Sequence, residues 1–132
     1  MSRRELREQI FKLLFRVEFN AKDEIPEQTQ LFFEEEENQA DVADTAYISE
    51  KLDKIVEKLE ELDETINSKV KGWDTARMGK VDLTILRLAV YEILFDEDIP
   101  TGVAINEAVE LAKKFGQDTS ASFVNGVLAL FA

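Results

Sequence analysis

A nearly continuous apolar segment, VDLTILRLAVYEILF at residues 81–95, constrains the fold of this chain more than any other stretch. Wound as an α-helix, it places Thr84, Arg87 and Tyr91 on one narrow stripe and leaves most of its circumference apolar. Such a helix is stable when other helices cover it, so the segment predicts a central helix inside a helical domain. Glu92 lies among the apolar residues and predicts a structural hydrogen bond, because an unpaired buried carboxylate is costly.

The residue types that are missing exclude several classes of site. The 132 residues contain no cysteine and no histidine, which excludes disulfides, histidine metal sites and Ser-His-Asp or Cys-His catalysis. Neither a GxxxxGK(S/T) nor a GxGxxG phosphate loop occurs. There is no run of 18 apolar residues to span a membrane, and the charged start MSRRELREQIFK is not typical of a secretory signal. We expect one domain over residues 1–132, in the cytoplasm, with no cofactor.

Charge is unevenly distributed, although the formal net charge is −12 at pH 7. Residues 1–16 carry five basic and two acidic side chains, whereas residues 17–64 carry four basic and seventeen acidic ones. The whole molecule therefore repels nucleic acid at long range. Salt screens such a field beyond about 8 Å, so a local basic surface near the beginning of the chain can still bind phosphates.

Apolar spacing predicts helices along the whole chain and no strands. We expect helices over about 3–19, from Pro26 to 33, from 48 to a break near Asp63, from there to Lys71, and over 81–95, 103–115 and 123–131. The acidic segment 34–45 is typical of a solvated linker, with Asp44 or Thr45 capping the helix that follows. Gly116 is placed to end one helix, and Thr119 or Ser120 to cap the last.

Beside the main apolar face of the first predicted helix lie three arginines and two aromatic residues, namely Arg3, Arg4, Arg7, Phe11 and Phe15. Two interpretations are equally supported. In the first, the phenylalanines pack on a second layer of helices and the arginines are solvated. In the second, the group forms a surface for phosphates and bases, or for a partner protein.

The residues 81–128 resemble the NusB-type transcription antitermination factors. The order VD, ILRLA-YE-L, DIP, INEA-ELAK-FG, a short polar loop and FVNGVL is that of the family, and SRRELREQIFKLLFRVEF resembles its arginine-rich first helix. The resemblance implies an all-α fold of about seven helices in two packed helical bundles around a central apolar helix. We expect the sub-bundles to cover roughly residues 1–72 and 73–132.

The resemblance also implies a function without enzymatic activity. NusB-type factors bind single-stranded boxA RNA together with the ribosomal protein NusE. The pair acts on the elongating RNA polymerase complex and opposes termination, notably in ribosomal RNA operons. Some relatives form homodimers, and the sequence does not decide this for the present chain.

Carried over residue by residue, the resemblance predicts two surfaces. RNA-binding residues would be Arg3, Arg4, Arg7, Phe115, Asp118, Thr119, Ser120, Ser122 and Phe123. Partner-binding residues would be Phe15, Glu18 and Asp82, where an acidic face suits a basic ribosomal protein. Both the RNA-binding and the partner-binding assignments follow from the match of these positions to the family pattern.

Some positions depart from that pattern. Ser122 stands where family members often have lysine, Leu83 stands where many have arginine, and Glu5 and Glu8 lie among the arginines of the first helix. These departures predict weak RNA affinity for the protein alone. Two other functions fit the same sequence: the RNA-holding N-terminal domain of a ribosomal RNA methyltransferase, and a purely structural helical interaction module.

Overall fold

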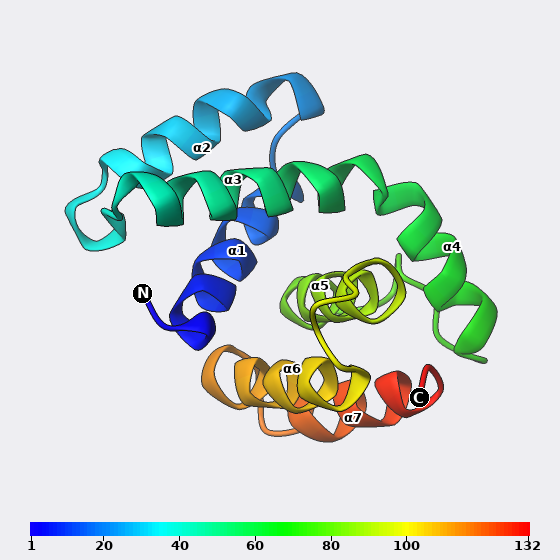
Figure 1. The fold of residues 1–132 in the computed structure, drawn as a ribbon. Helices are drawn as coiled ribbons and strands as arrows, with labels where there is room; N and C mark the ends of the chain where they lie inside the picture. Colours follow the sequence, from blue (N-terminus) through cyan, green and yellow to red (C-terminus); the bar gives the residue numbers. More distant parts are fainter. The chain divides into compact units, whose positions relative to one another are not determined.

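A computed structural model describes residues 1–132 as an all-helical chain without strands (Figure 1). The α-helices are α1 (Arg3–Val17), α2 (Ile25–Glu34), α3 (Val42–Glu57), α4 (Leu59–Lys69), α5 (Lys80–Phe95), α6 (Thr101–Phe115) and α7 (Ser120–Ala129), and the 3₁₀ helices are η1 (Lys22–Glu24) and η2 (Glu36–Asn38). The predicted all-α fold of about seven helices is confirmed. None of these helices combines the length and the apolar character needed to cross a lipid bilayer.

The helices form two compact units, Met1–Val56 and Glu57–Ala132. The sequence predicts a boundary near residue 72, which would leave α4 with the preceding helices. In the structure α4 packs against α5 and belongs to the second unit. The predicted break near Asp63 also lies elsewhere, at Lys58 between α3 and α4. Asp63 lies inside α4, where its carboxylate accepts two hydrogen bonds from Arg87 of α5.

The first unit has its core where α1, α2 and α3 contribute apolar side chains. The fully or almost fully buried ones are Ile10, Phe11, Leu13, Leu14, Ile25, Phe32, Ile48, Leu52 and Ile55. Pro26 lies in the first turn of α2, as predicted. Proline is tolerated there because a backbone N–H in the first turn has no acceptor within the helix. Helix α1 packs directly on α2, and Arg16 of α1 lies 5.0 Å over the ring of Phe32.

The acidic segment after α2 is more structured than a solvated linker. Glu34 to Glu37 are exposed, but Glu35 accepts a hydrogen bond from Arg16 at 2.8 Å and another from Asn38 at 2.9 Å. The cap of α3 also differs from the prediction. Asp41 accepts from the backbone N–H of Asp44 at 2.8 Å, so Asp41 caps the helix.

The second unit is built around α5, which packs against α4, α6 and α7. Every residue of α5 from Leu83 to Glu92 is buried, the polar stripe of Thr84, Arg87 and Tyr91 included. The prediction of a central helix is therefore confirmed for this unit. Helices α6 and α7 lie side by side (Figure 1) and leave the loop between them at one end of the unit.

Candidate nucleic-acid interface

The basic surface lies on the first turns of α1. Ser2 caps the helix: its Oγ accepts from the backbone N–H of Glu5 at 3.1 Å, and Glu5 Oε1 accepts from the backbone N–H of Ser2 at 3.2 Å. Hydrogen bonding to the Glu5 carboxylate from the Ser2 backbone N–H, and after it from the Ser2 side chain, holds the pKa of Glu5 below its usual value. Glu5, whose negative charge reduces the net positive charge of the arginine surface, is therefore also part of the capping box of α1.

The three predicted arginines are not equally available. Arg3 and Arg4 are exposed, whereas Arg7 is only 6% exposed. Arg7 lies one turn further along α1 and belongs to the buried residues of that helix, together with Ile10. Arg3 and Arg4 are thus open to solvent and Arg7 is not, and the RNA contacts predicted for all three stay predictions.

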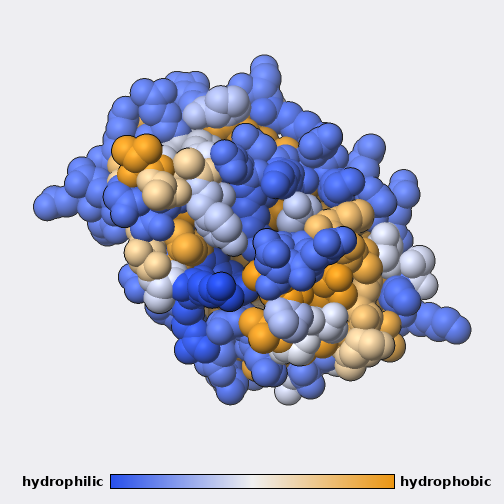
Figure 2. All heavy atoms as spheres, viewed as in Figure 1, coloured by the Kyte–Doolittle hydropathy of each residue, from blue (hydrophilic) through white to orange (hydrophobic).

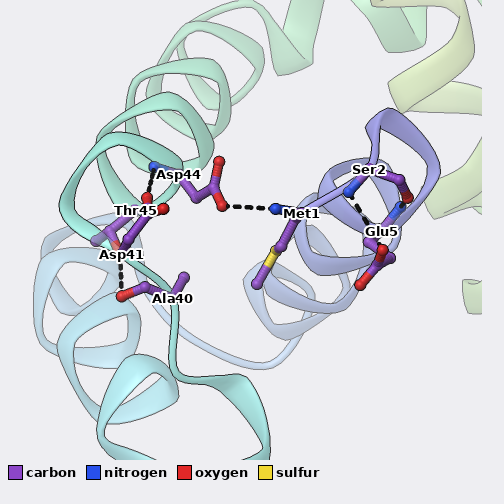
Figure 3. A network of polar contacts seen from close by, with 7 residues as sticks. All are labelled: Met1, Ser2, Glu5, Ala40, Asp41, Asp44 and Thr45. Atoms are coloured by element: carbon purple, nitrogen blue, oxygen red, sulfur yellow. Dashed lines mark hydrogen bonds and ion pairs between the residues drawn. The ribbon is translucent and has the colours of Figure 1, made fainter.

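The amino terminus ties the beginning of α1 to the beginning of α3 (Figure 3). The Met1 ammonium lies 3.0 Å from Asp44 Oδ2. The hydrogen bond to this carboxylate, and next its charge, raise the pKa of the amino terminus above its ordinary value. Because Asp44 is itself held in α3 by the Asp41 cap, the pair fixes the chain immediately before Arg3.

The loop between α6 and α7 is held by a close contact between its two ends. Gly116 follows α6, and a Cβ on it would lie 2.5 Å from the Cβ of Ser120. Its φ of −93° is open to any residue, so glycine is required here for space and not for backbone conformation. Ser120 Oγ accepts from the backbone N–H of Gln117 at 2.9 Å.

Ser120 therefore closes the loop and does not face solvent. Ser120 is only 3% exposed, and its predicted RNA contact stays a prediction. The loop residues Gln117, Asp118 and Thr119 are exposed, and so is Ser122 in the first turn of α7. Thr119 precedes α7 without a side-chain cap bond, so the backbone amides of the first turn remain a favourable position for a phosphate.

A pocket of about 440 Å³ lies next to this loop within the second unit. Its lining comprises Trp73, Met78, Gly79, Lys80, Val81 and Asp82 from before and within α5, and Phe115, Gly116, Gln117, Thr119, Ser120 and Phe123 from around the loop. The rings of Trp73 and Phe123 meet edge to face, with centroids 5.8 Å apart. The structure thus brings Phe115, Thr119 and Phe123 together with Asp82, which the sequence assigns to a different surface.

The other predicted partner-binding residues lie at the far end of α1. Phe15 forms an aromatic row with Phe11 at 6.3 Å and Phe19 at 5.2 Å between ring centroids. Glu18 follows α1 directly as its C-cap residue. Phe19, which is absent from the predicted site, is 64% exposed and extends this row into solvent. Figure 2 shows hydrophobic areas on an otherwise largely hydrophilic face.

Two exposed aromatic residues beside these surfaces, Trp73 and Phe19, are not among the residues that the sequence assigns to a site. Trp73 is the single tryptophan of the chain and is 52% exposed. A large exposed aromatic side chain can mark a binding surface, but its exposure becomes visible only in the structure. Phe19 continues the i, i+4 spacing of Phe11 and Phe15, which is the signal that could have identified it.

Comparison with known proteins decides the family. The model of the NusB family matches residues 4–132. The chain belongs to the NusB family. It is 58% identical over 132 residues to the transcription antitermination protein NusB of Agathobacter rectalis, with both chains covered completely. It is 46% identical to the corresponding protein of Geobacter sp., covering 96% of this chain and 91% of that protein.

Solved structures agree with this NusB membership. NusB of T. maritima superposes with a TM-score of 0.85 at 36% identity, covering all of this chain and 91% of that one. A crystal structure of the antitermination factors NusB and NusE in complex with dsRNA superposes with a TM-score of 0.79 at 27% identity, covering 98% of this chain and 94% of that one.

Proposed function

We propose that this chain is a transcription antitermination factor that binds boxA-type single-stranded RNA together with the ribosomal protein NusE. The pair would act on elongating RNA polymerase, notably in ribosomal RNA operons. The observation that carries this proposal is the 58% identity, over the full length of both chains, to a protein named for that role. The related complex of NusB with NusE and dsRNA supports both binding partners.

The proposed RNA surface has two parts, each described within its own unit. The first is the exposed arginine pair Arg3 and Arg4 at the start of α1, where cations can neutralise phosphates. The second is the loop before α7, with Asp118, Thr119, Ser122 and the aromatic rings of Phe115 and Phe123. Aromatic platforms beside cations and helix-start amides are what single-stranded RNA recognition uses.

The proposed NusE surface is the far end of α1. Phe15 and Phe19 offer an apolar contact, and Glu18 adds a negative charge next to it. A basic ribosomal protein would be attracted to this charge, because opposite potentials steer association. Asp82, the third residue predicted for this surface, lies in the second unit next to the RNA-binding loop, and we group it with that loop.

The chain works without catalysis in this proposal, as a binding adaptor. No three His, Cys, Asp or Glu side chains gather where they could hold a metal ion. The NusB family match covers residues 4–132, and the 58% identical relative of Agathobacter rectalis is named as a transcription antitermination protein, which favours the antitermination factor over the RNA-holding domain of a methyltransferase.

The test is a titration of labelled boxA RNA, followed by fluorescence anisotropy with and without NusE. Arg3→Ala/Arg4→Ala removes two exposed charges from the proposed surface. Lys22→Ala/Lys54→Ala removes the same charge from exposed positions elsewhere in the first unit and serves as the control. We expect the arginine pair to weaken binding and to reduce the log–log salt slope by about 0.7 for each phosphate that is no longer neutralised. If both double variants bind boxA RNA with the same affinity and salt dependence, Arg3 and Arg4 are not part of the RNA surface.

Glu18→Lys tests the partner surface separately. Charge reversal at this position should weaken NusE binding while leaving the melting temperature nearly unchanged, because Glu18 lies at the end of α1. Binding of the lone protein to RNA should also be unchanged. A loss of RNA binding without NusE would contradict the separation of the two surfaces.

A further inference from the structure

The pocket beside the α6–α7 loop has a feature that the RNA surface described above does not use. Trp73 lies in the connection between α4 and α5, more than half of its surface is exposed, and one ring edge is held by Phe123. The indole thus contacts Phe123 while more than half of its surface remains open to a ligand. An exposed indole is well suited to stacking on another flat ring.

The pocket is also of a suitable size and chemistry for one base. Its volume of about 440 Å³ falls within the range of roughly 300–1,000 Å³ that small-molecule sites occupy. Its lining combines aromatic rings with the half-buried carboxylate of Asp82. A carboxylate has two oxygens that only accept hydrogen bonds, so it favours a base edge that carries donors.

We infer that this pocket takes one unstacked guanine base of the bound RNA, stacked on Trp73 with its Watson–Crick edge towards Asp82. Guanine presents two neighbouring donors on that edge, N1–H and the N2 amino group, which match the two carboxylate oxygens of Asp82. Uracil presents a single N–H between two carbonyl oxygens, and the carboxylate repels both. Single-stranded RNA is commonly read in this way, by splayed bases that stack on aromatic rings and bond through their edges.

This inference rests on the proposed function and adds two residues to it. Trp73 becomes a stacking platform, and Asp82 becomes a base-selecting residue instead of a contact to the partner protein. Neither assignment depends on Arg3 or Arg4, which lie in the other unit.

The first experiment uses the single tryptophan as its own reporter. With ¹⁵N-labelled protein, the only indole N–H resonance belongs to Trp73. We expect GMP at millimolar concentration to shift this resonance, and UMP at the same concentration to shift it much less. Asp82→Asn should bring the two shifts close together. If GMP leaves the resonance unmoved, or if UMP shifts it equally in the unmodified protein, the inference is overturned.

The second experiment measures RNA binding by anisotropy in the presence of NusE. Base stacking contributes enough that Trp73→Ala should weaken binding about tenfold, whereas Trp73→Phe should retain most of the affinity. Tyr47→Ala, which removes another exposed aromatic ring from α3, is the matched control and should have no effect. Circular dichroism melting of each variant verifies that it is folded.

The two experiments separate this inference from the proposed function. If the unmodified protein binds boxA RNA and Trp73→Ala binds it equally well, the pocket is not a base site and the proposed function stands. If the unmodified protein does not bind boxA RNA with NusE present, the proposed function fails. The mononucleotide titration then still decides whether the pocket holds a guanine.

Discussion

Arg87 of α5 grips Asp63 of α4 through two parallel hydrogen bonds, from Nε to Oδ1 at 2.8 Å and from the terminal nitrogen to Oδ2 at 2.7 Å. This bidentate pair is partly buried, and it joins the helix that carries the centre of the second unit to its neighbour. The geometry is the one in which an arginine and a carboxylate interact most strongly. It explains why α4 belongs with α5.

Replacing Arg87 by methionine should therefore destabilise the second unit. The substitution keeps most of the stem but leaves Asp63 without its charged donor, and hydrogen bonds to charged groups contribute about 1.5–3 kcal/mol each. We expect a decrease in the free energy of unfolding at the lower end of that range, because both side chains retain some solvent contact. Urea denaturation measures it. When Asp63→Asn is added to Arg87→Met, the free energy of unfolding should decrease little further. If the double variant instead loses the sum of the decreases of the two single variants, the two residues do not interact.

Gly116→Ala should destabilise the protein and disturb the α6–α7 loop. The added methyl group would lie 2.5 Å from the Cβ of Ser120 and 2.7 Å from the carbonyl oxygen of Ala112. Forcing a methyl group into such a site costs about 1–3 kcal/mol. Thermal denaturation gives the decrease in stability, and boxA titration shows whether the loop is displaced.

Gly126→Ala is the matched control for that substitution. Gly126 lies inside α7 and has no atom within 4 Å of an added Cβ. Alanine should therefore stabilise the helix by about 0.5–1 kcal/mol. If Gly116→Ala lowers stability and Gly126→Ala raises it, the limited space at position 116, and not helix propensity, is the reason why glycine is needed there. Two decreases of similar size would contradict it.

The pair between the Met1 ammonium and Asp44 should make stability depend on pH in the alkaline range. The folded protein raises the pKa of the amino terminus above its usual value near 8. The stabilisation is therefore fully present below about pH 8 and is lost as the pH rises through the higher, folded-state pKa. Melting curves at pH 7 and pH 10 should show a larger decrease for the unmodified protein than for Asp44→Asn. The effect is small, since the pair is solvent-exposed, and identical decreases would show that the pair contributes nothing.

Ser122→Lys should strengthen RNA binding. Ser122 is exposed in the first turn of α7, and a lysine there would add a phosphate contact beside the loop. Three or four phosphate contacts correspond to a log–log salt slope of about −2 to −3 on single-stranded RNA, and one more contact should steepen it by about 0.7. Anisotropy titrations at two salt concentrations measure this change. Asn125→Lys, at an exposed position further along α7, should have a smaller effect.

The fold could be predicted from the sequence because its apolar periodicity is strong. Segment 81–95 forms α5 almost residue for residue. The regularly spaced apolar residues between Ile48 and Ile66 form the buried faces of α3 and α4. The helix ends were less predictable, since they depend on single polar contacts. Asp41, Asp44 and Thr45 are all able to cap α3, and only the fold decides that Asp41 does so.

The candidate site was predictable only in part. Exposed cations at the start of a helix, such as Arg3 and Arg4, follow from helical spacing alone. The burial of Arg7 and Ser120, and the meeting of Trp73 with Phe123 from 50 positions away, depend on tertiary packing that no local pattern encodes. The motif match placed the loop between the last two helices, whereas the position of the tryptophan beside it came only from the structure.

The contact between Gly116 and Ser120 has a consequence for how this loop can change over evolutionary time. The Ser120 hydroxyl and the narrow space beside Gly116 hold the two ends of the loop together, so a substitution at either position would alter its path. The side chains at 117–119 are exposed, and only the backbone N–H of Gln117 takes part in the bond that closes the loop. These three side chains can therefore diverge among descendants of this chain while the path of the loop is retained.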